Sequence, residues 1–419
     1  MKIIKNKKWE KENLNKNDVL IPQGWKVIRL EDEIVSFPPS KENASEGNKK
    51  GSYPFFNASA KQTLFSEKYL IDDESVIITT GGDYAFSLYY KGKFSFSSHV
   101  WCFKLKNHSN LFFNYLFKYR FDEIQNLAVK GFKLKNLNKK DFKNMQFVFP
   151  EIKEQQRIAD VLSKQESIIN KTKELINELD KRNTFMLDEL LSGRLRIKDE
   201  DGAITFYKNP EDNWQNVVMN GEEKRIPKDF ELSKIRKLCT WYSSGAALKA
   251  KEMKNEGKYP VVKMTDIKNG VIESGFKIYT DVFVEKSLLQ KGDIVIGLSG
   301  SVGKLGIVKT ETPLILNQRC LGMRIEKQRI ITLKVLEINF KDFILSKIKA
   351  GVIPNISHND VLDFVFSCPR DEREQESLSN LIKKIFDEKE NHEQLLIEEQ
   401  KKFDFLLEEL MSGRLRIEE

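Results

Sequence analysis

A stretch of 44 residues occurs twice in this chain of 419 residues, and this repeat limits the possible folds more than any other feature. Residues 154–197 align with residues 374–417 without a gap, and 16 of the 44 positions are identical. In both copies apolar residues recur at steps of three and four, and glycine first appears near the end, at Gly193 and Gly413. This pattern predicts two long helices, each with one apolar stripe and each ending at its glycine.

Each predicted helix needs a partner that covers its apolar stripe, and the other copy is the obvious candidate. A helix of ~38 residues is about 57 Å long, because each residue adds about 1.5 Å. We therefore expect the two helices to pair as an antiparallel coiled coil. In the alternative arrangement, each helix packs separately on its own globular domain.

Sparse matches outside the helices extend the repeat to the rest of the chain. Ile21-Pro22 corresponds to Ile226-Pro227, and Tyr53-Pro54 corresponds to Tyr259-Pro260. The prediction is an α+β fold with a pseudo-twofold internal repeat, in which two globular α/β domains are separated by the two long helices. The expected segments are an N-terminal arm (1–20), a first globular domain (21–150), a first long helix (151–197), a linker (198–225), a second globular domain (226–369) and a second long helix (370–419).

The net charge of +8 is divided unevenly along the chain. Residues 21–150 carry +6 and residues 226–369 carry +8, whereas the first helix region is neutral and residues 370–419 carry −6. Two basic domains indicate a polyanionic partner, and nucleic acid is the leading candidate. Because the chain lacks an apolar run long enough to span a membrane and a signal-peptide core at its start, we expect a cytoplasmic protein.

The sequence contains no catalytic motif that we can defend. Gly300-Ser301-Val302-Gly303-Lys304 looks like a phosphate-binding loop, but Leu298 stands where that motif needs its first glycine. The four cysteines and four histidines are scattered without metal-ligand spacing, so no metal site is predicted. We therefore expect a non-catalytic chain without a cofactor of its own. Two alternatives stay open: a self-contained DNA-modifying or DNA-cleaving enzyme of unfamiliar motif, and a coiled-coil scaffold that joins protein-binding modules.

Taken together and in this order, the motifs resemble those of the specificity (S) subunit of a type I restriction–modification system. The most specific signs are the two Glu-Gln…Leu-x-Ser-Gly-Arg-Leu-Arg-Ile helices, the Ile-Pro-x-x-Trp/Phe openings and the Gly-Asp-Ile-Val-Ile…Ser-Gly-Ser-Val-Gly segment at residues 292–303. The first domain departs from this pattern, because it reads Asp72-Asp73-Glu74-Ser75 at the corresponding strand. The resemblance covers residues 21–417.

The resemblance implies two target-recognition domains, each of which reads one half of a bipartite site in double-stranded DNA. It also implies that the paired helices set the spacer between the half-sites and dock two methyltransferase (M) subunits. Those subunits would bring S-adenosylmethionine and methylate adenine at N6. Restriction (R) subunits would add translocation and cleavage, which depend on ATP and magnesium.

Candidate contact residues follow from the repeat and from the glycine turns. Residues retained in both helices are the candidates for partner binding, although internal packing or helix termination could also explain them: Leu187, Leu190, Arg194, Arg196, Leu407, Leu410, Arg414 and Arg416. Lysines on loops would hold phosphates, and polar residues beside glycine turns would read bases. The candidates for DNA binding are Thr79, Thr80, Lys91, Lys93, Lys130, Lys133 and Lys135 in the first domain and Ser299, Ser301, Lys304, Arg319, Lys347, Lys349 and Asn355 in the second.

Overall fold

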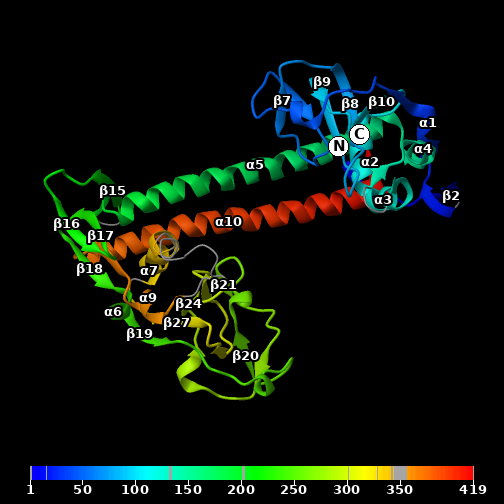
Figure 1. The fold of residues 1–419 in the computed structure, drawn as a ribbon. Coiled ribbons are helices and arrows are strands. Elements are labelled where there is room, and N and C mark those ends of the chain that lie inside the picture. The colour runs from blue at the N-terminus through cyan, green and yellow to red at the C-terminus, as the bar shows by residue number, and fades with distance from the viewer. Residues whose placement is uncertain are drawn as a thin grey trace. The chain divides into compact units, whose positions relative to one another are not determined.

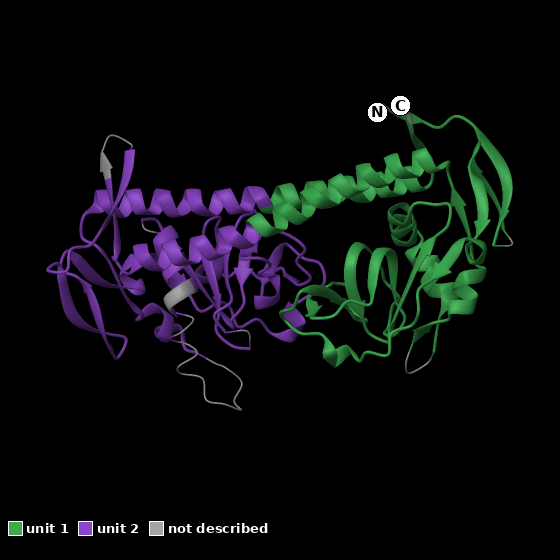
Figure 2. Cartoon of the chain, turned by 90° about the horizontal axis from the view of Figure 1, so that it is seen from above, with its two compact units in different colours: residues 1–175, 393–419 green, residues 176–392 purple. Residues whose placement is uncertain are grey.

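The computed structural model describes residues 2–15, 17–131, 135–200, 203–300, 302–327, 329–340, 343 and 356–418. The chain forms two compact units (Figure 2). Unit 1 comprises residues 1–175 and 393–419, and unit 2 comprises residues 176–392. Two helices of 40 residues, α5 (Ile152–Leu191) and α10 (Glu372–Met411), contribute residues to both units. Among the described residues, no helix is long and apolar enough to cross a membrane.

Both long helices end just before the retained glycine, as the sequence pattern predicts. Gly193 (φ 74°) and Gly413 (φ 71°) are left-handed, and their N–H groups donate to the carbonyls of Leu190 and Leu410. A side chain at either glycine would collide with a proline, Pro227 or Pro22. The Leu-Arg-Ile residues that follow are strands, β14 (Leu195–Glu200) and β29 (Leu415–Glu418). The predicted helix segments 151–197 and 370–419 therefore each extend past the helix into a short strand.

In each unit, the local parts of α5 and α10 lie side by side (Figures 1 and 2). In unit 2, Asn183 Nδ2 donates to the carbonyl of Ile385 (3.4 Å), and Lys389 Nζ donates to Asp180. Residue numbers fall along α5 as they rise along α10, so the helices are antiparallel. In unit 1, Gln165 Nε2 donates to the Glu399 carbonyl (3.2 Å). The antiparallel pairing is confirmed within each unit.

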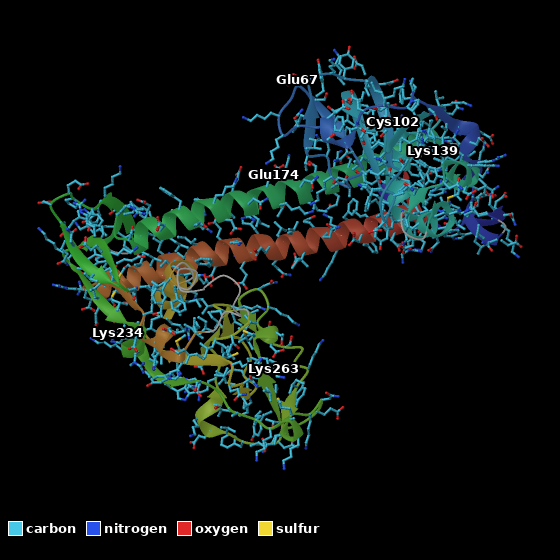
Figure 3. All side chains as sticks on the ribbon, in the orientation of Figure 1. Glu67, Cys102, Lys139, Glu174, Lys234 and Lys263 are labelled. Carbon is cyan, nitrogen blue, oxygen red and sulfur yellow. The ribbon has the colours of Figure 1, made fainter. Side chains whose placement is uncertain are left out.

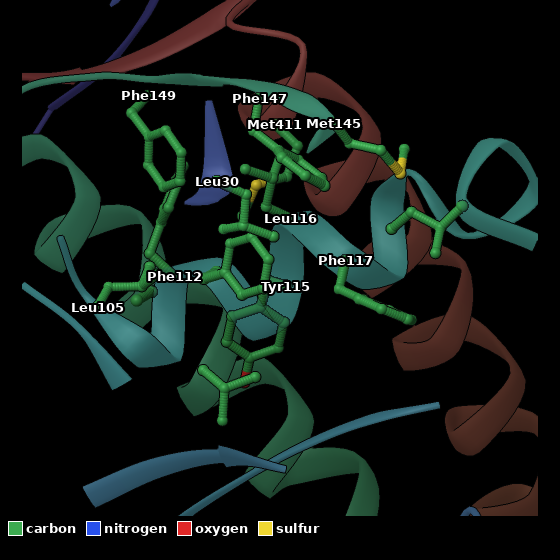
Figure 4. Close-up of a cluster of buried hydrophobic side chains, with 14 of the residues drawn as sticks. Leu30, Leu105, Phe112, Tyr115, Leu116, Phe117, Met145, Phe147, Phe149 and Met411 are labelled. Atoms are coloured by element: carbon green, nitrogen blue, oxygen red, sulfur yellow. The ribbon is translucent and has the colours of Figure 1, made fainter. Parts of the chain in front are cut away.

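The inner side of each helix also packs on the globular body of its unit. In unit 1, Ile158 and Leu162 of α5 are completely buried in the main core, together with Phe403 of α10. Figure 4 shows part of this core, in which the ring centres of Phe112 and Phe149 lie 5.9 Å apart. The two arrangements that the sequence left open are thus combined, since each helix contacts both the other helix and the globular body.

The main sheet of unit 1 has six strands, and three short helices accompany it (Figure 1). Neighbouring strands are antiparallel except for one parallel pair, β6 with β9. The strand order is β5 (Ile34–Ser36), β10 (Val100–Leu105), β8 (Ile71–Thr79), β9 (Ser87–Phe96), β6 (Tyr53–Phe56) and β7 (Leu64–Ser66). The helices are α2 (Asn110–Tyr119), α3 (Phe121–Ala128) and α4 (Lys139–Asn144), and a short pair joins β4 (Lys26–Arg29) to β13 (Gln146–Phe149).

Unit 2 repeats this frame in two smaller sheets. The order β5–β10–β8–β9 is matched by β19 (Cys239–Ser243), β27 (Cys320–Ile325), β24 (Ile294–Gly297) and β25 (Leu305–Val308), followed by β21 (Val271–Ile272). The second sheet contains β22 (Tyr279–Thr280), β20 (Tyr259–Val262), β26 (Leu314–Leu316) and β23 (Leu288–Leu289). The remaining elements include α6 (Ile235–Leu238), α7 (Arg329–Val335), α9 (His358–Leu362) and the pair of β18 (Phe230–Lys234) with β28 (Val365–Pro369).

The registers of the two frames agree. Trp101 lies opposite Ile78 in unit 1, and Leu321 lies opposite Ile296 in unit 2. The parallel pair recurs as well, with Phe55 opposite Ser95 and Val261 opposite Ile315. The predicted α+β fold with an internal repeat is therefore confirmed.

The predicted N-terminal arm and the predicted linker are corresponding pieces of folded structure. Each contains a hairpin, formed by β2 (Trp9–Leu14) with β3 (Asn17–Pro22) and by β16 (Trp214–Met219) with β17 (Glu222–Pro227). Strand β1 (Lys2–Lys5) pairs with β29, just as β15 (Ala203–Lys208) pairs with β14. These pieces repeat at an offset of 205 residues, whereas the helices repeat at 220. The helix alignment therefore does not reveal them.

An asparagine at the tip of each hairpin fixes it to the body of its unit. Asn220 has a left-handed backbone (φ 56°), and its side-chain amide exchanges two hydrogen bonds with the backbone of Val365 (2.7 and 2.8 Å). Asn15 (φ 50°) does the same with the backbone of Gln146 (3.4 and 2.9 Å). Each asparagine thus combines a backbone conformation that few residues adopt with two contacts to a neighbouring strand.

We expect Asn220→Gly to lower the free energy of unfolding by about 1–2 kcal/mol, because glycine adopts the same φ but loses both side-chain hydrogen bonds. Asn15→Gly should behave similarly. Urea titration measures the effect. Asn269→Gly is the matched control, since Asn269 is also left-handed (φ 49°) and no described contact uses its side chain. Equal losses in all three variants would contradict this role.

Candidate nucleic-acid interface and partner surface

Three chain segments meet at a glycine turn in unit 1. The N–H of Thr80, just after β8, donates to the His99 carbonyl (2.9 Å), and the N–H of Leu137 donates to the Thr80 carbonyl (3.0 Å). The N–H of Gly82 donates to the Lys135 carbonyl (3.3 Å). These bonds gather the exposed side chains of His99, Lys135 and Asn136 beside Thr80. We name these four residues the unit 1 loop cluster.

Two of these three hydrogen bonds recur in unit 2, with different side chains around them. The N–H of Leu298 donates to the Arg319 carbonyl (3.0 Å), and the N–H of Ile356 donates to the Leu298 carbonyl (2.9 Å). The N–H of Gly297 donates to the Lys304 carbonyl (2.9 Å). The turn thereby gathers Ser299, Lys304 and Arg319, which we name the unit 2 loop cluster. Arg319 corresponds in position to His99, so equivalent places in the two units carry unlike groups.

The loop clusters contain five of the predicted DNA-binding residues and exclude others. Thr80 and Lys135 lie in unit 1, and Ser299, Lys304 and Arg319 lie in unit 2; their DNA contacts stay predictions. Lys133, Ser301, Lys347, Lys349 and Asn355 lie outside the described residues. His99 and Asn136 were missed, although the glycine turn that they contact was recognised in the sequence.

The predicted DNA contact of Thr79 is wrong, because this residue is completely buried in β8. Its hydroxyl accepts a hydrogen bond from the Phe86 N–H (2.8 Å), so the side chain serves the sheet. Residues 75–79 of β8 are all buried, which means that both faces of this strand end are covered. In the sequence, a run of β-branched residues before a glycine turn does not show where the strand ends. A buried residue at the strand end therefore cannot be told apart from an exposed residue in the turn.

The remaining predicted lysines of unit 1 lie apart from the loop cluster or have carboxylate partners. Lys91 and Lys93 are on β9, toward the end of the β8–β9 pair that lies away from the glycine turn. Lys93 is 4.0 Å from the Asp72 carboxylate, and Lys130 forms an ion pair with Asp141. The structure therefore does not join Lys91 and Lys93 to Thr80 and Lys135. Lys130, in contrast, lies opposite Asn136 of the loop cluster, where β11 (Val129–Lys130) pairs with β12 (Asn136–Leu137).

The described residues contain no group of three or more His, Cys, Asp or Glu that could hold a metal ion. Burial raises the pKa of Cys239 to about 11 and that of Cys320 to about 12. Burial also raises the pKa of Cys102 and that of Cys368. These thiols are therefore protonated at neutral pH, and only the thiolate is a good nucleophile.

The retained ends of the long helices form a clamp in each unit. In unit 2, Arg196 follows α5, and its guanidinium donates to Glu374 of α10 (2.6 and 2.8 Å) and to Asp229 (2.8 and 3.0 Å). In unit 1, Arg416 follows α10 and donates to Glu154 of α5 (2.6 and 2.7 Å). Burial alone would lower the pKa of Arg196, but its bonds to both carboxylates raise it instead.

The retained glutamine next to each clamp binds the backbone of the residues that lead into its helix. Gln155 Nε2 donates to the Pro150 carbonyl (2.8 Å), and Gln375 Nε2 donates to the Pro369 carbonyl (2.5 Å). Gln155 also lies 2.8 Å from Nδ1 of His108, whose ring stacks on Phe149 at 4.2 Å. The Glu-Gln pairs of the repeat are thus explained by folding within each unit.

We expect His108 to make unit 1 less stable at mildly acidic pH. Burial lowers the pKa of His108, despite the opposing effects of Glu33 and Gln155. A histidine with a lowered folded pKa contributes stability above its unfolded pKa of about 6.5, and this contribution is lost as pH falls through the folded pKa. His108→Leu should flatten the fall of the melting temperature below about pH 6.5, whereas exposed His358→Gln should not. An unchanged pH profile in His108→Leu would contradict this role.

Most of the predicted partner-binding residues instead pack inside their own unit. Leu187, Leu190 and Leu410 are at most 3% exposed, and Leu407 packs against the core of unit 1. Arg196 and Arg416 form the clamps described above. Folding within each unit therefore explains why the repeat retains these six residues, which is the alternative that the sequence left open. Arg194 and Arg414 are exposed, with 46% of each side chain accessible, so their partner contact stays a prediction.

A second retained set, which the sequence analysis missed, lies on the outer side of each helix. Phe185 is 68% exposed and Phe405 is 58% exposed, although both are large and apolar. The set has the spacing Glu-x-x-Lys-x-x-x-Phe-x-x-x-Glu, which places its members on one helix face. We call the two copies the outer stripes: Glu178, Lys181, Phe185 and Glu189 in unit 2, and Glu398, Lys401, Phe405 and Glu409 in unit 1.

The outer stripes lie opposite the faces that fold the protein. On α5, Asn183 and Leu187 flank Phe185 by two positions on either side, which is about half a turn, and both are buried. Arg194 extends the stripe, because it forms ion pairs with Asp188 and Glu189. Arg414 does the same with Glu408 and Glu409. The sequence did contain a signal for the outer stripes. Their residues are identical in the two copies but do not fall at the positions of the apolar stripe.

A model of the family "Type I restriction modification DNA specificity domain" matches the chain twice, at residues 22–181 and 227–399. The chain is 25% identical over 445 aligned positions to the type I restriction enzyme MjaVIII specificity subunit of Methanocaldococcus jannaschii, covering 98% of this chain and 97% of that protein.

Two solved structures have a similar fold. The S subunit of a type I restriction–modification system from M. genitalium matches with a TM-score of 0.61 and 17% identity, covering 92% of this chain and 96% of that one. A chain from a structural study of assembly and conformational transition of the type I R-M system matches with a TM-score of 0.50 and 13% identity, covering 94% and 99%. Because the family model matches both repeated halves, the chain belongs to the family of type I restriction modification DNA specificity domains.

Proposed function

We propose that this protein is the DNA-specificity subunit of a type I restriction–modification complex, in which each unit reads one half of a bipartite duplex site. The two loop clusters support this proposal. They share two corresponding backbone hydrogen bonds on the same strand frame, yet they present His99 and Lys135 in unit 1 and Lys304 and Arg319 in unit 2. Basic and polar groups beside a tight turn suit contacts to phosphates and base edges.

The observation that carries the proposal is the contrast between like outer stripes and unlike loop clusters. Phe185 and Phe405 do not face the core, so folding does not explain why both helices keep this aromatic residue. Two equal surfaces on one chain suit two copies of one partner, and an exposed aromatic residue among charges is a typical anchor of a protein interface. We assign the stripes to two methyltransferase subunits.

The chemistry in this proposal comes from the partners. The methyltransferase subunits would supply S-adenosylmethionine and modify adenine, and restriction subunits would supply ATP- and magnesium-dependent cleavage. The chain described here would act without catalysis of its own, in the cytoplasm where the DNA lies. Its paired helices would set the spacer between the two half-sites.

Two assays test the proposal. The complex of this chain with its methyltransferase subunits is mixed with labelled duplexes of different sequence in an electrophoretic assay, and a preference for particular sequences is expected. The chain alone is then incubated with DNA, magnesium and S-adenosylmethionine, and no turnover is expected. A complex without any sequence preference, or methylation or cleavage by the chain alone, would contradict the proposal.

A further inference from the structure

A pocket of about 420 Å³ lies in unit 1 where α4 meets strand β10. Trp101 and Cys102 of β10 form one side, Phe37 and the two prolines after it form another, and α4 contributes three lysines. Figure 3 labels Cys102 and Lys139, which both line this pocket. We call it the lysine pocket. None of its lysines, Lys139, Lys140 and Lys143, belongs to the predicted DNA-binding set.

The lysines of the pocket have no carboxylate partner among the described residues, although two carboxylates are close in sequence or space. Glu31 lines the pocket, but Arg29 binds it at 2.7 Å. Asp141 lies on α4 itself, but Lys130 binds it. Burial and the neighbouring charge of Lys143 lower the pKa of Lys139, as expected where cations gather without compensation. The pocket therefore holds an excess of positive charge.

Trp101 organises this charge and cannot itself receive a base. The ammonium groups of Lys139 and Lys143 lie 5.5 and 5.8 Å from the centre of the Trp101 ring, within cation–π range. Trp101 is only 6% exposed, and its indole N–H points to Ser36 Oγ at 3.3 Å. Stacking a base would require an open ring face. The pocket consequently offers two oriented cations, which suit a phosphate group better than a base edge.

Two chain segments of the unit 1 loop cluster continue directly into residues that line the lysine pocket. Trp101 of β10 follows His99, in the turn before this strand, by two residues, and α4 begins three residues after Asn136. Asn138 caps α4 by accepting hydrogen bonds from the N–H groups of Lys140 and Asp141 (3.1 and 3.2 Å), which fixes where the lysines emerge. A duplex whose bases reach the loop cluster would therefore bring its backbone close to the lysine pocket.

Unit 2 lacks this charge excess at the corresponding place. There α9 carries His358, Asn359 and Leu362 where α4 carries the three lysines, and Leu321 stands in place of Trp101. The cations nearby, Lys234 and Arg236, both have the Asp363 carboxylate within 3.5 Å. The charge of the lysine pocket is thus a property of unit 1 alone among the described parts of the two frames.

We infer that the lysine pocket binds a phosphodiester group of the DNA backbone and anchors the duplex beside the unit 1 loop cluster. This inference rests on the proposed function. A phosphate contact fixes position without reading sequence. Loss of the anchor should therefore weaken binding of every duplex by a similar factor and leave the preference between sequences unchanged.

The test uses the complex of the full chain with its methyltransferase subunits and several fluorescein-labelled duplexes of different sequence. Binding constants are measured over a series of salt concentrations for the wild type and for Lys139→Gln with Lys143→Gln. Each lost phosphate contact should reduce the slope of log K against log [salt] by about 0.9. Because the pocket holds one phosphate group, we expect a reduction of about one such step. Trp101→Leu, which copies unit 2, should weaken binding less, because it removes the ring but no charge.

The matched control is Lys49→Gln with Lys50→Gln, which removes the same charge from two exposed residues of the same unit that do not belong to the predicted DNA-binding set. A salt slope that is unchanged in the Lys139/Lys143 variant, an equal reduction in the control, or a loss confined to sequence preference would each overturn the inference. All variants are first checked for a wild-type melting temperature. If instead the wild-type complex shows no sequence preference, the proposed function fails, and that outcome is separate from the behaviour of the lysine pocket.

Discussion

Replacing Phe185 and Phe405 together by aspartate is expected to abolish assembly with the methyltransferase subunits while the chain still folds. Both side chains are mostly exposed, so their replacement should change the free energy of unfolding by only about 0.5 kcal/mol. An aromatic anchor at an interface contributes about 2 kcal/mol or more, which corresponds to roughly a 30-fold loss of affinity at each site. A buried aspartate in its place would add the cost of removing a charge from water.

The single variants separate the two docking sites. Phe185→Asp should leave one methyltransferase subunit bound at the unit 1 stripe, and Phe405→Asp should leave one at the unit 2 stripe. Native mass spectrometry of the purified complexes counts the bound subunits. Ile168→Asp and Ile397→Asp are the matched controls, because these residues are 44% and 48% exposed on the same helices but are not retained between the copies. Two subunits bound to the double variant would refute the assignment.

The second large effect is expected from Arg196→Met, which should destabilise unit 2 by about 3–5 kcal/mol. The side chain of Arg196 is only 4% exposed, and Glu374, which it binds with two bonds, is only 13% exposed. Methionine preserves most of the packing on Phe230 but leaves the Glu374 carboxylate buried without its cation. Urea titration gives the change in the free energy of unfolding.

Arg194→Met provides the control for this prediction. Arg194 is two residues away and also binds two carboxylates, but it is largely exposed, so its loss should cost no more than about 1 kcal/mol. Hydrogen exchange should show faster opening of the first turns of α10 in Arg196→Met only. Similar costs for the two variants would mean that burial of the clamp does not determine its contribution.

The long helices and the internal repeat could be predicted from the sequence because both leave regular signals. Apolar steps of three and four define a helix face, and a glycine after the last apolar residue marks its end. The same pattern placed Leu187 and Leu410 correctly on a helix but could not say whether they face the protein or a partner. Since folding and binding both retain residues, identity between the copies becomes informative about binding only when exposure is known, as for Phe185 and Phe405.

The loop clusters were predicted in part. Glycine turns identified Thr80 and Ser299, since a strand that ends in glycine predicts an exposed turn. His99 and Asn136 were missed because they reach the turn from other strands and loops, and contacts between distant segments leave no local signal. The hairpins with Asn15 and Asn220 were missed for a related reason. Their repeat offset differs from that of the helices, and only a few residues, such as the asparagine at the tip, are shared.

The central claim is that the two units read separate halves of one DNA site, and a matched pair of substitutions tests it most directly. His99→Ala in unit 1 and Arg319→Ala in unit 2 alter corresponding positions of the two loop clusters. For each variant, the adenines methylated by the complex are mapped by sequencing genomic DNA. We predict that each variant relaxes the sequence of one half-site, that the two variants affect different halves, and that the spacer stays the same. Changes in both halves from a single variant, or in the same half from both, would contradict the claim.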